Sequence, residues 1–241
     1  MDNLIQKFKE LRLKNCADNM EEILKTAATK NLSTKDTLGR LLDFELEARE
    51  RARIALRYKQ ANLDEKTTID GFDFNHHASR KNYKTLILNL MGMDFIQKKM
   101  DIVLIGNPGV GKSHLAKCLA YAATQKGIKT LFTTAMDMIN QLITAEANQT
   151  LLKKLHYYQS QDLLVCDEIG YLPLGKQGSH LFFQVISARH TKKSTVITTN
   201  LPFAEWSNIF DGTTAATAIA DRLIYNSEIL ILEGKSYRTK S

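Results

Sequence analysis

Residues Gly106–Ser113 read Gly-Asn-Pro-Gly-Val-Gly-Lys-Ser and match the phosphate-binding pattern G-x-x-x-x-G-K-[ST] at every fixed position. The run before this loop, Ile102–Ile105, is short and apolar, which is typical of a buried strand. After the loop, Leu115, Leu119 and Ala123 recur at helical spacing. The sequence therefore predicts a strand, a glycine-rich loop and a helix in the order that this pattern requires.

The residue types of the loop suit phosphate binding. Glycines let the backbone curl so that several N–H groups face one anion, and the helix that follows adds the partial positive charge of its N-terminus. Lys112 would place a charge beside the β- and γ-phosphates, and Ser113 would offer a hydroxyl to Mg²⁺. A glycine-rich turn without a ligand is the alternative. The loop residues expected to bind a nucleotide are Gly106, Asn107, Pro108, Gly109, Val110, Gly111, Lys112 and Ser113.

Composition limits the classes of protein. The chain has 241 residues, of which 44% are hydrophobic and 24% charged, an ordinary globular profile. Its formal net charge of +7 favours a polyanionic partner, although many basic proteins have none. Cys16, Cys118 and Cys166 are too few and too widely spaced for a disulfide framework or a metal site. The sequence has no signal peptide and no apolar run of about 18 residues, so we expect a soluble cytoplasmic protein without a membrane partner.

Residues 1–60 carry apolar residues at helical spacing. Within them, Ser33 and Asp36 form a capping-box pattern that would begin a second helical segment. The later part of that segment, residues 45–53, is dense in charge of both signs. It is either a solvated helix face with i,i+4 ion pairs or a surface that contacts DNA or a partner protein, and charge patterning does not choose between them.

The pattern changes in the polar stretch 62–75, so we expect a helical domain over residues 1–65 and a larger domain over residues 66–241. In the larger domain, short apolar runs alternate with helical segments. This alternation is typical of an α/β fold in which helices cover both faces of a parallel sheet. The predicted strands are 102–105, 129–133, 163–166, 195–198 and 229–232, and the predicted helices after the loop's own are 136–145, 150–159, 181–189 and 215–225.

Polar residues end two of the predicted strands. Asp167 and Glu168 follow the apolar run 163–166, and strand ends in such sheets face the ligand crevice. Asp167 would hold Mg²⁺, and Glu168 would orient and deprotonate an attacking water. Asn200 follows the strand 195–198, where it would either hold that water or form a turn. The sequence thus predicts the two halves of a nucleotide hydrolase site.

Further candidates lie outside these strands. Arg222 follows an alanine-rich helix, and Arg238 follows the last predicted strand. Each would stabilise the charge on the γ-phosphate in a neighbouring subunit or form a surface salt bridge, and sequence spacing does not choose. Positive charge used on DNA phosphates would make binding tolerant of sequence and sensitive to salt. The candidate DNA contacts are Thr134, Lys153, Lys154 and Lys176.

Together these features resemble the IstB branch of the AAA+ ATPases, helper proteins of insertion-sequence transposition that are related to the DnaC helicase loaders. The resemblance covers nearly the whole chain and implies an AAA+ P-loop NTPase core, without a full C-terminal lid, after a small all-helical N-terminal domain. His114 is included with the nucleotide-binding residues because histidine at this position is a habit of the family. The segments that carry the resemblance are Leu11–Leu13, Phe44–Arg53, Gly71–Phe74, Gly111–Ala116, Asp162–Tyr171, Thr199–Trp206, Ala220–Leu223 and Gly234–Arg238.

The resemblance also implies a function. Such a protein hydrolyses ATP with Mg²⁺, assembles as a homo-oligomer on double-stranded DNA, bends it, and presents it to the partner transposase of the same element. Arg222 would act in trans as an arginine finger, and Arg238 would be a second sensor. The helical domain 1–65 would contact other subunits, DNA, the transposase, or a combination of these.

Three other functions are compatible with a phosphate loop. A DnaC-like helicase loader would bind single-stranded DNA and a hexameric helicase, but Phe203–Trp206 and the mixed-charge helix favour the transposition helper. A nucleotide-gated DNA scaffold would barely hydrolyse ATP, and Glu168 and Asn200 argue against it. A small-molecule kinase would need a second substrate pocket, of which the sequence gives no sign.

Overall fold

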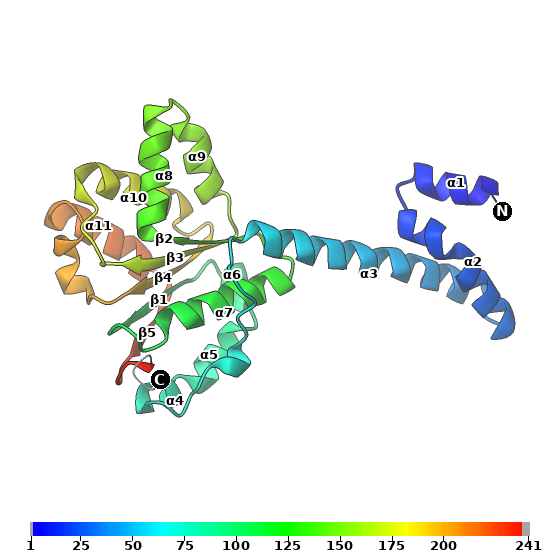
Figure 1. Ribbon diagram of the computed structural model, residues 1–241, viewed down its shortest axis with the longest axis horizontal. Helices are drawn as coiled ribbons and strands as arrows, with labels where there is room; N and C mark the ends of the chain where they lie inside the picture. The colour runs from blue at the N-terminus through cyan, green and yellow to red at the C-terminus, as the bar shows by residue number, and fades with distance from the viewer. Residues whose placement is uncertain (1, 238–241) are drawn as a thin grey trace. The chain divides into compact units, whose positions relative to one another are not determined.

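The computed structural model describes residues 2–237 (Figure 1). Its internal contacts divide the chain into two units, Met1–Leu56 and Arg57–Ser241. The division falls inside a long helix, α3 (Thr34–Gln60), and earlier in the chain than the boundary expected near residue 65.

The last turn of α3 and the residues after it belong to the second unit because they bond to it. Arg57 Nε donates a hydrogen bond to the Gly127 carbonyl at 3.2 Å. The Phe132 N–H donates to the Ala61 carbonyl at 2.8 Å, and Asn62 Nδ2 donates to the Phe132 carbonyl at 3.1 Å. The two bonds to Phe132 satisfy backbone groups on an edge strand of the sheet that would otherwise be unpaired.

The first unit consists of α1 (Asp2–Glu10), α2 (Lys14–Thr29) and most of α3. Ser33 caps α3 as the predicted capping box requires, since the Asp36 N–H donates to Ser33 Oγ at 3.1 Å. The Asp36 carboxylate accepts from the Ser33 hydroxyl, at 2.6 Å, where a full capping box would use the Ser33 N–H. A small apolar core holds the unit together, and its buried members are Cys16, Met20, Ile23 and Leu41.

Glu45 lies in the mixed-charge part of α3 but is only 4% exposed. Its carboxylate accepts hydrogen bonds from the N–H groups of Asn15, at 2.8 Å, and Cys16, at 3.3 Å, in the first turn of α2. Arg49 Nε donates to the same carboxylate at 2.8 Å. A negative charge is favourable at a helix N-terminus, so this part of the charged helix stabilises the unit as well as facing solvent.

The second unit alternates helices and strands along the chain. Its elements are η1 (Ile69–Gly71), α4 (Ala78–Asn82), α5 (Lys84–Leu90), α6 (Asp94–Gln97), β1 (Asp101–Gly106), α7 (Lys112–Gln125), β2 (Thr130–Thr134), α8 (Ala135–Ala147), α9 (Leu151–Gln159), β3 (Leu163–Ile169), α10 (Gly175–Arg189), β4 (Ser194–Thr199), η2 (Phe203–Asn208), α11 (Gly212–Ile224) and β5 (Ser227–Leu232).

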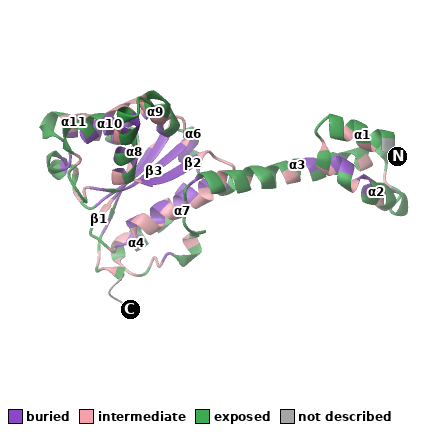
Figure 2. Cartoon of the chain, turned by 45° about the horizontal axis from the view of Figure 1, so that its top comes forward, coloured by how far each residue is buried: buried purple, intermediate pink, exposed green. Residues whose placement is uncertain are grey.

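The strands form a parallel five-stranded sheet in the order β2-β3-β4-β1-β5 within the described residues. Two apolar clusters lie on its two faces, one beneath α7 with α5 and α6, the other beneath α8 to α11 (Figure 1). Strands β1 to β4 are the most deeply buried part of the unit (Figure 2).

This architecture confirms the predicted α/β class and each predicted strand. The largest difference in extent is α10, which begins at Gly175 rather than near residue 181. Its first turn is polar and contains two glycines, so apolar periodicity alone does not reveal it.

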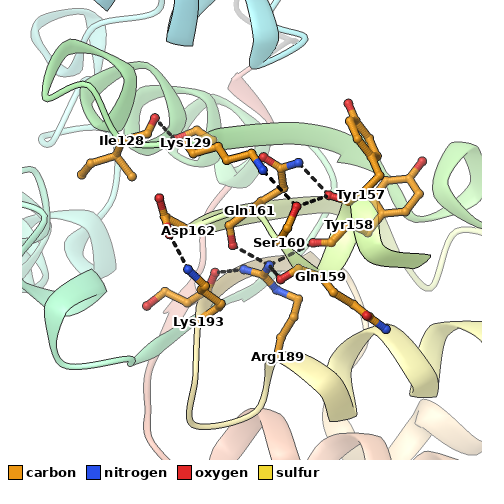
Figure 3. Close-up of polar contacts among 12 residues, drawn as sticks. Ile128, Lys129, Tyr157, Tyr158, Gln159, Ser160, Gln161, Asp162, Arg189 and Lys193 are labelled. Atoms are coloured by element: carbon orange, nitrogen blue, oxygen red, sulfur yellow. Dashed lines mark hydrogen bonds and ion pairs between the residues drawn. The ribbon is translucent and has the colours of Figure 1, made fainter. Parts of the chain in front are cut away.

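A buried arginine, Arg189, joins the end of α9 to the starts of β3 and β4 (Figure 3). It is 1% exposed and donates to the carbonyls of Tyr158 at 3.0 Å and Gln161 at 2.8 Å. It also donates to the Ser194 carbonyl and to Thr195 Oγ1. Burial lowers the pKa of its guanidinium to about 10, which leaves it charged at neutral pH. The charge therefore fixes the backbone at one end of the sheet.

Candidate functional site

The phosphate loop runs from β1 to α7, and close approach requires its glycines. Gly111 has a φ of 96°, and a Cβ there would lie 2.7 Å from Arg80 Nη2 and 3.1 Å from Phe72 Cε2. Gly109 has a φ of 82°, and a Cβ there would lie 2.1 Å from Ser236 Oγ. A side chain at either position would clash and would strain the backbone.

Lys112 is the first residue of α7 and is 9% exposed. Its ammonium donates to the Gly106 carbonyl at 2.7 Å and to the Asn107 carbonyl at 3.0 Å. The charge is therefore held against the loop itself, beside the helix N-terminus, where an anion is favoured.

A pocket of about 220 Å³ opens beside the loop. Three separated segments of the chain form it. Of the loop residues expected to bind a nucleotide, Gly109, Gly111, Lys112 and Ser113 line it, as does His114, whereas Gly106, Asn107, Pro108 and Val110 do not. The remaining lining residues are Gly71, Phe72, Asp73, Arg80 and Tyr237.

Arg80 is a site residue that the sequence did not single out. It is 2% exposed, and its guanidinium donates twice to the Val110 carbonyl, at 2.6 and 3.1 Å, and once to the Asp73 carbonyl at 2.9 Å. Its guanidinium carbon lies 4.6 Å from the centroid of the Phe72 ring. Arg80 thus links the segment before β1 to the phosphate loop through hydrogen bonds. In the sequence, only the basic character of residues 76–84 set this region apart.

His114 lines the pocket and packs against Phe72. Its ring stacks on Phe72, with centroids 6.0 Å apart and planes 27° apart. Within residues 2–237, its buried Nε2 atom has no hydrogen-bond partner. Burial lowers the pKa of this imidazole, so it is neutral at physiological pH. An unpaired buried nitrogen is unfavourable unless a ligand satisfies it.

Asp167 and Glu168 occupy a β-bulge. The pairing of β3 with β4 runs to Cys166 and resumes at Ile169 with a shifted register, and Glu168 has a φ of 61°. Strained backbone of this kind is concentrated at functional sites. Asp167 is 5% exposed, whereas Glu168 is exposed. The bulge therefore gives two neighbouring carboxylates different surroundings.

Thr198, on β4, holds this bulge. The Glu168 N–H donates to Thr198 Oγ1 at 2.9 Å, and Thr198 Oγ1 donates to Asp167 Oδ1. One hydroxyl thus positions both residues of the pair. The sequence placed Thr198 within a strand but gave no sign of this bond, because the bulge that creates it is a tertiary feature.

Glu168 does not line the pocket beside the phosphate loop. It lines a separate cavity of about 240 Å³, together with Thr134, Met136 and Tyr171. Asn200 is exposed just beyond β4, and its Oδ1 atom lies 3.1 Å from the position of a Cβ on Gly170. Asn200 therefore contacts the segment that follows Glu168.

Of the two arginines expected to stabilise the γ-phosphate, the structure describes Arg222 but not Arg238. Arg222 is half-buried on α11, where its Nη1 donates to the Ala218 carbonyl at 2.8 Å and its guanidinium carbon lies 4.6 Å from the Phe183 ring centroid. Among residues 2–237, no carboxylate forms an ion pair with it, and it does not line the pocket beside the phosphate loop. Arg238 lies outside the described residues.

The four candidate DNA contacts are spread over three helices. Thr134 caps α8, since its Oγ1 accepts from the Asp137 N–H at 3.0 Å. Lys153 is exposed on α9, and Lys154 next to it lies over two tyrosine rings. Lys176 is exposed in the first turn of α10. In the described part of the chain, no helix is both long and apolar enough to cross a membrane.

The fold and the loop together define a nucleotide-binding P-loop domain with the AAA+ fold. The model of the family described as IstB-like ATP binding protein matches residues 6–241, and the chain belongs to this family. It is 34% identical over 230 residues to an ATP-binding protein of insertion sequence IS232 from Bacillus thuringiensis subsp. berliner, covering 95% of this chain and 91% of that protein. It is 36% identical, with the same coverage, to an ATP-binding protein of insertion sequence IS5376 from Geobacillus stearothermophilus.

A solved structure supports the fold. The DnaC helicase loader superposes with a TM-score of 0.60 and 22% sequence identity, covering 69% of this chain and 96% of that chain. At this identity the likeness shows the architecture alone.

Proposed function

We propose that this protein binds and hydrolyses ATP with Mg²⁺, and that this reaction controls its assembly on double-stranded DNA and its contact with the transposase of the same insertion sequence. The observation that carries the proposal is the joint presence of a phosphate loop with a buried lysine and, on a nearby strand, a bulge holding two carboxylates. The insertion-sequence proteins at 34% and 36% identity support the transposition setting.

The chain's own groups suit the phosphates of ATP. The loop N–H groups and the Lys112 ammonium would bind them, and the N-terminus of α7 adds favourable charge. Phe72, Tyr237 and the neutral His114 line the same pocket, and the base would lie against them. Flat aromatic faces are suitable for a base that stacks.

Ser113 and Asp167 would hold Mg²⁺, which supplies charge neutralisation for the phosphates. Both offer the hard oxygen ligands that this ion prefers. Within residues 2–237, no three His, Cys, Asp or Glu side chains are grouped as a metal site. This donor set fits an ion that takes only one or two protein ligands and completes its shell with phosphate and water.

Hydrolysis would depend on Glu168 as the base that orients and deprotonates water, and on Asn200 as a polar contact to that water. The exposed position of Glu168 allows its side chain to turn without breaking a buried contact. Its backbone N–H is fixed by Thr198. The bulge thus anchors the backbone of the residue while the residue itself stays exposed.

Changing Thr198 to valine should destabilise the fold and slow turnover. Valine has the same shape but leaves Asp167 Oδ1 and the Glu168 N–H without their partner, which costs about 1–3 kcal/mol. Urea unfolding measures the stability, and a phosphate-release assay measures the turnover. Thr198→Ser, which keeps the hydroxyl, is the matched control and should retain both. Equal behaviour of the valine and serine variants would show that the hydroxyl does not position the pair.

Binding to duplex DNA should be tolerant of sequence and should weaken steeply with salt. The net charge of +7 favours binding to phosphates, and each neutralised phosphate contributes about 0.9 to the slope of log affinity against log salt. Fluorescence anisotropy with two duplexes of unrelated sequence, from about 50 to 200 mM salt, measures it. A flat salt dependence would remove phosphate binding from the proposal, and a strong preference for single strands would favour the helicase-loader alternative.

We also propose that the N-terminal unit contacts other subunits or the transposase. Leu38, Leu42 and Leu46 recur every fourth residue on α3 and are 53%, 51% and 62% exposed. Unburied leucines on one helix face are suitable for a protein partner.

Removing residues 1–56 should therefore leave ATP binding intact and abolish both regular assembly on DNA and capture of the transposase. Starting the chain at Arg57 keeps the bonds to Gly127 and Phe132 that complete the second unit. Equilibrium ATP titration, electron microscopy of DNA complexes and transposase pull-down provide the three measurements. Unchanged assembly and capture would assign the N-terminal unit another role.

A further inference from the structure

The second unit has a second cavity, larger than the pocket beside the phosphate loop, against the edge strand β2. It encloses about 510 Å³. Alternate residues of a strand point to one face. Leu131 and Thr133 of β2, with Lys129 just before the strand, form one side of the cavity. The last turn of α3, which includes Lys59, and the end of α9, which includes Tyr157, also line it.

This cavity is positively charged. Its lining includes Lys59 and Lys129 and no acidic residue. The ammonium of Lys154 lies beside it, 4.9 Å from the centroid of the Tyr157 ring and 5.4 Å from that of Tyr158, and both tyrosines line the cavity. In the part of the chain that the structure describes, none of these three lysines forms an ion pair with a carboxylate. Charges that are not neutralised around a concave surface favour an anion.

The wall of the cavity is fixed before any ligand binds. The buried Arg189 donates hydrogen bonds to the carbonyls of Tyr158 and Gln161 (Figure 3). Gln161 Nε2 in turn donates to the Tyr157 carbonyl at 2.7 Å. Lys129 Nζ donates to Ser160 Oγ at 2.9 Å on the same side. A wall held by a buried charge loses little freedom on binding, which favours affinity.

The shape favours an extended anion over a compact one. A shallower groove along α8 and α9 adjoins the cavity, since Gln141 lines both. Amide and hydroxyl side chains make up most of that groove, and Lys154 also lines it. Its one carboxylate, Asp137, accepts a hydrogen bond from Thr134 Oγ1 at 2.8 Å. Tyr157, which lines the cavity, is 42% exposed and lies beneath the Lys154 ammonium. Lysines along a continuous concave surface suit the phosphates of a nucleic acid backbone.

From this arrangement we propose that the cavity beside β2 binds the phosphate backbone of DNA, with Lys59 and Lys154 contacting phosphates and Tyr157 contacting the sugar or base. The proposal rests on the DNA-binding function proposed above and assigns it a site. Of the four DNA contacts expected from the sequence, it retains Lys154, and it adds Lys59 and Tyr157.

The test compares two double variants of the full-length protein that each remove two positive charges. Lys59→Gln with Lys154→Gln alters the cavity, whereas Lys98→Gln with Lys99→Gln alters two exposed lysines before β1. Anisotropy with duplex DNA should show about a tenfold or larger loss of affinity for the cavity variant and a salt slope shallower by about 2, the effect of leaving two phosphates without a lysine. The control should change affinity by less than about threefold. ATP affinity should be unchanged in both.

A second measurement identifies the occupant in the unmodified protein. Duplex DNA should protect Lys59 and Lys154 from acylation by a lysine reagent and leave Lys98 and Lys99 reactive, whereas ATP alone should protect neither pair. Equal loss of DNA affinity in the two double variants, or protection of the cavity by ATP instead of DNA, would overturn the assignment. A wild-type protein that does not bind DNA at all would refute the proposed DNA function itself. Strong DNA binding that the cavity variant retains would refute only this site.

Discussion

Replacing Glu168 with glutamine should leave ATP binding near its wild-type strength and lower turnover by about 10²–10⁴-fold, the usual contribution of a general base. Glutamine has nearly the same shape but cannot accept the proton of the attacking water. The bond that holds the bulge uses the Glu168 backbone N–H, not its side chain. Because the side chain is exposed, the substitution buries no unpaired group.

The matched comparison is Lys112→Ala, which should abolish ATP binding. Alanine removes the cation held at the loop, and with it the donor to the Gly106 and Asn107 carbonyls. Equilibrium binding of a fluorescent ATP analogue and single-turnover hydrolysis separate the two effects. Wild-type turnover by the glutamine variant would exclude Glu168 as the base. Loss of binding in that variant would instead give the carboxylate a role in holding the nucleotide.

The sequence predicted the parts of the site that are local. Gly106–Ser113 specifies its own conformation, because glycine spacing and the start of a helix are properties of neighbouring residues. The strand that leads to Asp167 could be predicted in the same way, because a short run of apolar residues ends there. The order of these elements along the chain was enough to predict a parallel sheet with both motifs at the carboxyl ends of its strands.

The parts that were not predicted depend on contacts between distant segments. Arg80 and Tyr237 lie near the two ends of the second unit's sequence, yet both line the pocket beside the phosphate loop. Thr198 becomes a partner of Asp167 only because a bulge shifts the register of two strands. The spacing of these residues in the sequence does not indicate that they lie close together in the fold.

Charged residues were the hardest to interpret. Glu45, in a helix dense with charge, could be solvated or in contact with a partner, and the structure shows that it caps α2. Arg189 carried no sequence signal, yet it is a buried anchor for three segments. The sequence gives the sign of a charge, whereas its environment depends on which carbonyls or N–H groups the fold places around it.

Replacing Arg222 with alanine should lower ATP turnover by about 10³–10⁵-fold, the contribution of an arginine finger, while leaving the ATP affinity of the isolated subunit almost unchanged. The reason is its position. Arg222 lies on α11 against Phe183, has no carboxylate partner in the described part of the chain, and does not line the pocket of its own subunit. A cation without a carboxylate partner at a helix end is available to a neighbouring subunit.

Mixing variants tests whether Arg222 acts between subunits. Arg222→Ala retains a complete nucleotide pocket but supplies no finger, whereas Lys112→Ala supplies a finger but cannot bind ATP. If the finger acts in trans, a mixed assembly contains interfaces that pair an intact pocket with an intact arginine, and turnover should recover in part. Phosphate release is measured on DNA across mixing ratios, with Arg222→Lys as a control that keeps the charge but loses the planar guanidinium. Absence of recovery at every ratio, although the mixed assemblies form, would show that each site is completed within one chain.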